Sequence, residues 1–341
     1  MLPHWRRTVL AYRVIGALPG GEHLFDWYKV SFGGLRRFDL ARRGYLLREM
    51  PMLLRGAQAT IEGKDLIEIG AGWHPLLPVV FHGMGARSIV MTDISRHLRQ
   101  ELVEQTVEFC LEHADEIAAL VDADAATLKV RWSALRPGRN RWLDVWESRG
   151  ITYAAPMDFG HSGLPAESVD IVYSNSCLNY VPMSNLREIA AESTRILRPG
   201  GQALHDISVY DDLASGQPSI PGWNFLKFGD EEWERIGNSR IHYQNRCRPI
   251  SYAALVVESG MRIVWDEHIL GSLGEADLDR SVLDPRFKAL PAEEILCWHY
   301  LLAAERLAAS PGSTKISASS AKEQVHGDHR AGWTSDSTSS R

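Results

Sequence analysis

Several features of common protein classes are missing from this sequence. Its four cysteines are spread over 341 residues without the spacing of metal ligands or of a disulfide framework, which favours reduced thiols and argues against structural zinc. No stretch approaches the roughly 18 to 20 apolar residues of a membrane-spanning helix, and the N-terminus lacks the apolar core and cleavage site of a signal peptide. We therefore expect a cytoplasmic protein without a bound metal.

Surplus positive charge is also scarce, except near the N-terminus. The net charge of -6 argues against a protein that coats nucleic acid. Residues 1–50 are an exception, with eight Arg and one Lys against two Asp and two Glu, a local charge of +5. Because this segment also carries apolar and aromatic side chains, it could contact a membrane surface or an anionic substrate. A solvated helical lid is the interpretation that we favour.

The most informative feature that is present is an apolar strand that runs into a glycine turn. Leu66, Ile67 and Ile69 predict a buried strand. The turn Gly70-Ala71-Gly72 lets the main chain approach a ligand where a side chain would collide. Pro75 and the apolar residues after it predict a helix. The first N–H groups of a helix have no partner within the helix, so a proline, which lacks an N–H, costs no hydrogen bond there.

Four further patterns follow this turn in order. Residues 88–93 form a second strand that ends in Asp93, about 20 residues beyond the glycines. A third strand ends in Asp158, and a fourth, 169–176, runs from apolar to small polar residues. A helix then ends in Leu-Arg-Pro-Gly-Gly, residues 197–201, before a fifth strand. Together with Glu68 just before the glycines, these motifs resemble those of the class I S-adenosylmethionine-dependent methyltransferases.

This resemblance implies that S-adenosylmethionine is the cofactor. It also implies that Asp93 binds the ribose, that Ile94 lies on the adenine face and that Asp158 accepts the adenine amino proton. Small polar residues after the fourth strand would contact the same ligand. The predicted cofactor-binding residues are Glu68, Gly70, Ala71, Gly72, His74, Asp93, Ile94, Asp158, Phe159, Ser174 and Asn175.

Strands alternate with helical patterns from residue 61 to about 304, which indicates an α/β fold with a parallel sheet covered on both faces. The resemblance implies a Rossmann-like sheet of seven mostly parallel strands, plus N-terminal and inserted helices. Its antiparallel closing pair would be 261–265 and 294–302, with the last strand beside the fifth. The predicted parts are a helical lid segment (1–60), a methyltransferase domain (61–305) with a helical insertion (about 96–150) and an acceptor-covering region (about 210–245), and a disordered, serine-rich tail (306–341).

Methyl transfer to oxygen or nitrogen requires alignment with the donor and loss of a proton, for which a positioned base contributes about 10²- to 10⁴-fold. The catalytic candidates lie on or just after the fifth strand: His205, Asp206 and Asp211. Arg246 and Arg248 could bind an acidic acceptor through paired donors, or could pair with structural groups instead. Asn179 is a further candidate substrate contact.

Two alternatives from other classes stay open at this point. A nicotinamide-dependent oxidoreductase also begins with Gly-x-Gly, but its fingerprint requires a third glycine or alanine where this chain has Pro75. A catalytically silent cofactor-binding regulator is mildly favoured by Asn179 and Tyr180, which replace the Glu-His frequent in small-molecule methyltransferases.

Two sequence motifs that are absent narrow the range of possible methyl acceptors. The Asn/Asp-Pro-Pro-Tyr/Phe loop and the Pro-Cys nucleophile of nucleic-acid enzymes are both absent, and residues 174–177 read Ser-Asn-Ser-Cys instead. The sequence therefore predicts a methyltransferase that acts on an oxygen or nitrogen of a small-molecule, sugar or lipid-like acceptor. It names neither that acceptor nor the oligomeric state.

Overall fold

The computed structural model describes residues 4–32, 46–138, 141–214, 217, 220–272 and 274–308. The predicted disordered tail, 306–341, lies outside these residues apart from its first three positions.

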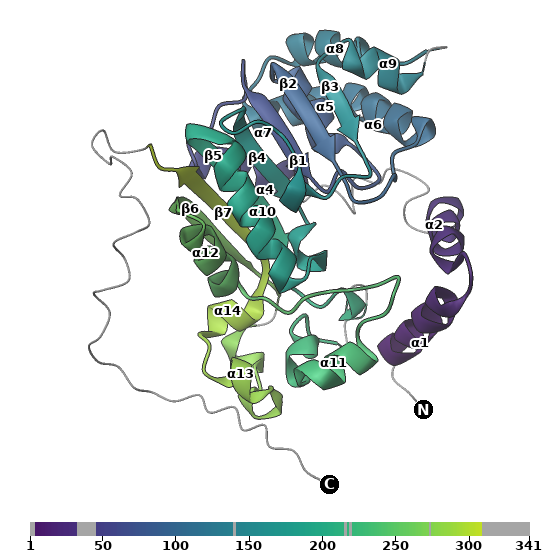
Figure 1. The fold of residues 1–341 in the computed structure, drawn as a ribbon, viewed down its shortest axis with the longest axis vertical. Coiled ribbons are helices and arrows are strands. Elements are labelled where there is room, and N and C mark those ends of the chain that lie inside the picture. Colours follow the sequence, from purple (N-terminus) through teal and green to yellow (C-terminus); the bar gives the residue numbers. More distant parts are fainter. Residues whose placement is uncertain are drawn as a thin grey trace, which may run out of the picture. The chain divides into compact units, whose positions relative to one another are not determined.

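The described residues form one seven-stranded sheet in the order β3-β2-β1-β4-β5-β7-β6 (Figure 1). The first five strands run parallel, and β7 is antiparallel to both of its neighbours. The mostly parallel sheet with its last strand beside the fifth is therefore confirmed. The strands are β1 Asp65–Ile69, β2 Ser88–Thr92, β3 Ile151–Ala154, β4 Val169–Asn175, β5 Leu197–Ser208, β6 Met261–Leu270 and β7 Cys297–Arg306.

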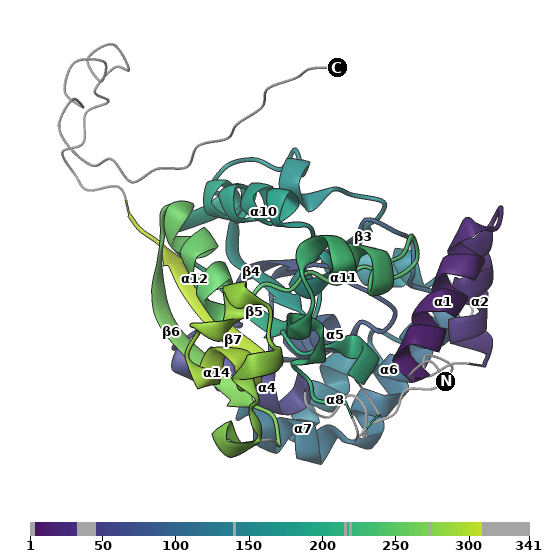
Figure 2. The same ribbon diagram turned by 90° about the horizontal axis from the view of Figure 1, so that it is seen from below.

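Helices cover both faces because the central strands are apolar on both sides. In β1, Leu66 packs into one core and Ile67 into the other. Figure 2 shows α10 and α12 on one side of the sheet and α4, α7 and α8 on the other. The first face carries α10 Met183–Ile196 and α12 Pro249–Glu258; the second carries α4 Leu46–Gly56, α5 Leu76–Gly83, α6 Gln100–Glu112, α7 Ala114–Val121, α8 Ala125–Ser133 and α9 Trp142–Glu147.

A third apolar core lies beside the sheet and joins the N-terminus to the segment after β5. Trp5 and Val9 of α1 pack there with Phe225 and Trp233. Arg13 adds hydrogen bonds to the carbonyls of Glu234 and Asn238. The elements outside the sheet layers are α1 His4–Ala17, α2 Gly21–Ser31, α11 Asp230–Ile236, α13 Pro285–Lys288, α14 Ala292–Leu296 and the short 3₁₀ helices η1 Phe159–His161, η2 Leu178–Tyr180, η3 Asp212–Ala214, η4 Asn224–Lys227, η5 Glu275–Asp277 and η6 Arg280–Val282.

One strand prediction is wrong at its start. Residues 294–296 belong to α14, and the last strand begins only at Cys297. Glu293 and Glu294 lie in the first turn of that helix, where the helix dipole favours acidic side chains. Ile295 and Leu296 then pack into the third core, so their apolar run reflects a buried helix turn that single-sequence periodicity does not separate from a strand.

None of the helices that the structure describes is both long and apolar enough to cross a bilayer.

Candidate functional site

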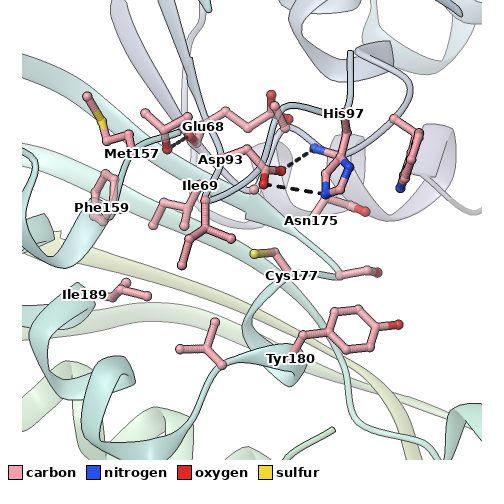
Figure 3. Close-up of a pocket in the computed structure, with 18 of the residues that line it drawn as sticks. Glu68, Ile69, Asp93, His97, Met157, Phe159, Asn175, Cys177, Tyr180 and Ile189 are labelled. Atoms are coloured by element: carbon pink, nitrogen blue, oxygen red, sulfur yellow. Dashed lines mark hydrogen bonds and ion pairs between the residues drawn. The ribbon is translucent and has the colours of Figure 1, made fainter. Parts of the chain in front are cut away.

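A cavity of about 570 Å³ opens at the carboxyl ends of β1, β2 and β4. This is the point where the strand order reverses, at which open α/β sheets bind ligands, and the volume lies in the range of small-molecule sites, about 300 to 1,000 Å³. Figure 3 shows Glu68, Asp93 and His97 on one side of the cavity and Cys177, Tyr180 and Ile189 on the other. The lining also includes Gly70, Ala71, Gly72, Trp73, His74, Ile94, Met157, Asp158, Phe159, Asn175 and Ser176.

The glycine turn forms one wall, and its shape depends on two left-handed residues. Gly70 has φ 78° and Gly72 has φ 61°. The amides of Gly70 and Ala71 both donate to the carbonyl of Thr92 at 2.9 Å, which fixes the turn to the end of β2. A Cβ on Gly70 would lie 2.3 Å from the Cys177 sulfur, whereas a Cβ on Gly72 would come no closer than 4.0 Å to another atom, the Gly70 carbonyl oxygen. The glycines therefore leave room for a ligand and for the loop after β4.

Asp93 ties this turn to the loop after β2. Its Oδ2 accepts the amide of Gly72 and its Oδ1 the amide of Ser95, both at 2.9 Å. The side chain is 9% exposed and lines the cavity, and each carboxylate oxygen keeps a lone pair that a ligand's donor could use. A pair of aromatic rings, which we did not predict, lies beside it. His97 is 3.9 Å from the carboxylate (Figure 3). Its ring stacks on Trp73 at 4.4 Å between ring centroids.

Glu68 is a buried carboxyl with an unused acceptor. Its Oε2 has no hydrogen-bond partner among the described residues, although the residue lines the cavity. Burial, and next the charge of Asp93, raise the pKa of Glu68 well above its ordinary value. A buried polar atom is normally satisfied by protein, water or ligand. Together with the open glycine turn, this orphaned atom fits a cofactor that brings hydrogen-bond donors to the end of β1.

Most of the other predicted cofactor contacts line the same cavity. Asp158 accepts the amide of Gly160 at 3.0 Å and lies 3.2 Å from His161 Nδ1. Phe159 is buried and Ile94 is 76% exposed, and both line the cavity. Asn175 lines it at the end of β4, whereas Ser174 does not.

Ser174 and His205 point away from the cavity, towards α10 and α12. The Ser174 hydroxyl lies 2.9 Å from His205 Nδ1, and both side chains are buried. His205 lines a small separate recess with Leu178 and Leu255. Burial lowers the pKa of His205 to about 4, so its imidazole is neutral near pH 7. The structure therefore does not bring His205 to a position where it could take a proton from a ligand in the cavity.

The two predicted catalytic aspartates are also fully buried and line none of the cavity. Asp206 accepts the Asn175 side-chain amide at 2.8 Å and lies 2.9 Å from His299 Nδ1. Asp211 accepts the amide of Leu213 at 2.9 Å and the side chain of Asn224 at 3.0 Å. Through Asn175, Asp206 positions a cavity residue without touching the cavity itself.

Asp211 gives a pH-dependent contribution to stability. Burial raises its pKa from 3.8 to about 6, so between these values the unfolded chain releases a proton that the folded chain keeps, and stability falls as pH rises. Asp211→Asn removes this loss. We expect the free energy of unfolding of the variant, relative to wild type, to rise by about 2 to 3 kcal/mol from pH 4 to pH 7 in urea titrations. The hydrogen bonds that Asp211→Asn loses change the free energy of unfolding by the same amount at every pH. A difference between variant and wild type that does not change with pH would therefore contradict the prediction.

The predicted substrate contacts lie outside the cavity. Arg246 donates to the Phe225 carbonyl at 3.0 Å and pairs with Asp230 at 2.5 Å. Arg248 is 2% exposed and donates only to main-chain carbonyls, among them those of Glu294 and Cys297. These contacts favour the structural alternative for both arginines.

Asn179 is 1% exposed and does not line the cavity either. Its carbonyl accepts the amide of Asn245 at 2.8 Å.

Part of the chain is similar to a known protein family. Residues 121–205 match a family model described as a methyltransferase domain, a stretch that runs from the end of α7 to β5 and excludes the glycine turn. No curated protein matches significantly. Among solved structures, an S-adenosylmethionine-dependent methyltransferase from Mesorhizobium loti shares 19% identity, with a TM-score of 0.43, over 76% of this chain and 98% of that one. One from Methanosarcina mazei shares 13%, with a TM-score of 0.41, over 73% and 94%.

Residues 121–205 match a methyltransferase domain, and the ordered motifs and the strand order support a class I S-adenosylmethionine-dependent methyltransferase whose cofactor is S-adenosylmethionine. The nicotinamide alternative gives no account of the methyltransferase match or of an antiparallel β7 between β5 and β6.

Proposed function

We propose that this enzyme methylates an oxygen or nitrogen atom of a small-molecule, sugar or lipid-like acceptor. The observation that carries the proposal is the composition of one cavity wall. On the side of Cys177, the cavity continues along Tyr180, Val181 and Ile189, so this wall is mainly apolar, with Asn185 among its polar members. Such walls suit a small organic acceptor better than a polyanion. A cytoplasmic location is part of the same proposal.

We propose that the cavity residues around the glycine turn bind different parts of the cofactor. Asp93 binds the ribose, Glu68 orders the turn and accepts from the cofactor, and Ile94 with Phe159 contacts the adenine. Asp158 accepts the adenine amino proton. Asn175 contacts the same ligand from the end of β4.

The helical parts outside the sheet would cover the site. We propose that residues 1–60 form a lid segment, that 61–305 is the catalytic domain and that 210–245 helps to enclose the acceptor. The packing of α1 on the segment after β5 supports this division, because one apolar core joins the lid segment to the 210–245 region.

Removal of the Asp93 carboxylate tests the cofactor assignment directly. Asp93→Ala is expected to weaken S-adenosylmethionine and S-adenosylhomocysteine binding by about tenfold or more in calorimetry, about 1.4 kcal/mol, because it loses the ribose contact and the bond to Gly72. Asp279→Ala is a matched control, since Asp279 accepts the amide of Ser281 two residues on, as Asp93 does with Ser95, but lies outside the cavity. Unchanged binding in Asp93→Ala would refute the assignment.

Turnover separates the enzyme from a silent cofactor-binding regulator. The wild type is expected to convert S-adenosylmethionine to S-adenosylhomocysteine in the presence of a member of a panel of hydroxylated and amino-bearing metabolites. A panel of sugars, phenols, amines and prenyl compounds covers the proposed acceptor classes. Cofactor binding without turnover on any of them would count against the proposed acceptor.

A further inference from the structure

A cluster of polar side chains lies between α4 and the sheet, outside the cofactor cavity. Glu49 of α4, Asp206 of β5 and His299 of β7 each offer one metal-ligating atom, and these atoms all lie within 4.8 Å of one another. Among the described residues this is the one group of three such side chains. The three residues are far apart in the sequence, and the fold alone brings them together.

The distances within this cluster match those between ligands of one metal ion. His299 Nδ1 lies 2.9 Å from Asp206 Oδ1 and 3.4 Å from Glu49 Oε2. Nitrogen and oxygen ligands bind zinc at about 2.0 to 2.2 Å, so two ligands of one ion lie about 3.0 Å apart at a right angle and about 3.4 Å apart at a tetrahedral angle. The cluster therefore needs little movement to coordinate an ion.

Two further observations indicate that a ligand is missing. Glu49 is 7% exposed, yet its Oε2 makes no hydrogen bond. Ser208, directly opposite His299 in the β5–β7 ladder, is 4% exposed, and its hydroxyl is likewise without a partner among the described residues. Opposite residues in a ladder point to the same face, so the Ser208 hydroxyl is a fourth oxygen on the side of the sheet that α4 covers.

Charge points to a cation. Two buried carboxyl groups lie next to one imidazole, and burial together with the charge of Asp206 raises the pKa of Glu49 to about 8. A cation bound here would displace the Glu49 proton and be balanced by two carboxylates. The mix of one imidazole nitrogen with carboxylate oxygens suits Zn²⁺ or Mn²⁺ better than Mg²⁺, which prefers oxygen ligands and retains its water.

We propose that Glu49, Asp206 and His299 form a binding site for a divalent transition-metal ion, Zn²⁺ or Mn²⁺. An ion there would join α4 to β5 and β7. It would also hold Asp206, which accepts the side chain of Asn175 at the cofactor cavity. The site lies beyond the proposed function, because none of the three residues lines that cavity.

Direct metal binding tests the proposal. The tag-free full-length protein is treated with a chelator, dialysed, and titrated with Zn²⁺ and with Mn²⁺ by calorimetry, with electron paramagnetic resonance for Mn²⁺. One ion per chain and a higher melting temperature in its presence are expected. Glu49→Gln, which is nearly isosteric but a far weaker ligand, is expected to lower the affinity at least tenfold, and His299→Gln likewise.

The chain offers a matched control in another buried glutamate. Glu294 is 6% exposed and lies 3.5 Å from His268, but no third potential ligand accompanies this pair in the part of the chain that the structure describes. Glu294→Gln is expected to leave metal binding unchanged. Circular dichroism and S-adenosylmethionine binding of Glu49→Gln show whether the variant is folded, and both are expected to be retained.

Three results would overturn the proposal. The first is a wild type that binds no stoichiometric ion, and the second is metal affinity of Glu49→Gln and His299→Gln equal to that of the wild type. The third is a loss of metal affinity in Glu294→Gln as large as that in Glu49→Gln. In each of these cases the cluster is a hydrogen-bonded network alone. None of these results depends on methyl transfer, so failure of this proposal and failure of the proposed function are distinguishable.

Discussion

Gly70→Ala is expected to lower the affinity for S-adenosylmethionine about a hundredfold. The new Cβ would lie 2.3 Å from the Cys177 sulfur and 2.7 Å from its Cβ, so the turn or the loop after β4 must move. The substitution also places a side chain at φ 78°, which costs about 1 to 2 kcal/mol. Overpacking adds about 1 to 3 kcal/mol, and each 1.4 kcal/mol is a tenfold change in affinity.

A control separates the collision from the backbone strain. Gly63 has φ 71°, close to that of Gly70, but a Cβ there would meet no atom within 4 Å, and the residue lies before β1, away from the cavity. Gly63→Ala therefore carries the left-handed strain alone and is expected to bind the cofactor as the wild type does. Calorimetric titration with S-adenosylmethionine compares the two variants.

Removal of the opposing side chain provides a second test. In the double variant Gly70→Ala/Cys177→Gly the collision is absent, and only the cost of the left-handed backbone at residue 70 remains. The affinity for S-adenosylmethionine is therefore expected to be about tenfold below that of Cys177→Gly alone. If the double variant binds as weakly as Gly70→Ala, contact with Cys177 is not what requires a glycine here.

The local part of the site was predictable from sequence because it consists of a few consecutive residues. The strand, the glycine turn and the acidic end of β2 follow from apolar runs and from two positions that need a left-handed backbone. Asp93 and Gly72 are 21 residues apart, yet they meet because parallel neighbouring strands end at the same edge of the sheet.

The direction of individual side chains was not predictable. Ser174 and Asn175 are adjacent in β4, but only Asn175 reaches the cavity, because successive residues of a strand point to opposite faces. The same alternation sends His205 towards α12 and Asp206 towards α4. A strand that is buried on both faces carries no polar–apolar alternation that would assign these faces.

Contacts between distant segments were not predictable either. The stack of Trp73 on His97 depends on how the turn after β1 meets the loop after β2. The cluster of Glu49, Asp206 and His299 depends on the docking of α4 and on the register of β7, so cysteine counts and local spacing could not reveal it. No sequence separation marks these residues as neighbours.

Arg248→Met is expected to lower the free energy of unfolding by about 3 to 5 kcal/mol. The guanidinium is buried at the junction of three elements: it donates to the carbonyl of Val209 after β5, to that of Glu294 in α14 at 2.7 Å and to that of Cys297 in β7 at 3.0 Å. Methionine fills much of the same volume but donates no hydrogen bond, so buried carbonyls lose their partner. Urea unfolding followed by circular dichroism measures the loss.

Arg246→Met is the comparison that distinguishes a structural role from acceptor binding. Arg246 also donates to carbonyls, but its carboxylate partner Asp230 is 71% exposed, so water can replace the lost contact and a smaller loss, about 1 to 2 kcal/mol, is expected. An unfolding free energy of Arg248→Met within about 1 kcal/mol of wild type would contradict the structural role. Such stability, with a raised KM for an anionic acceptor, would instead restore Arg248 as a substrate contact.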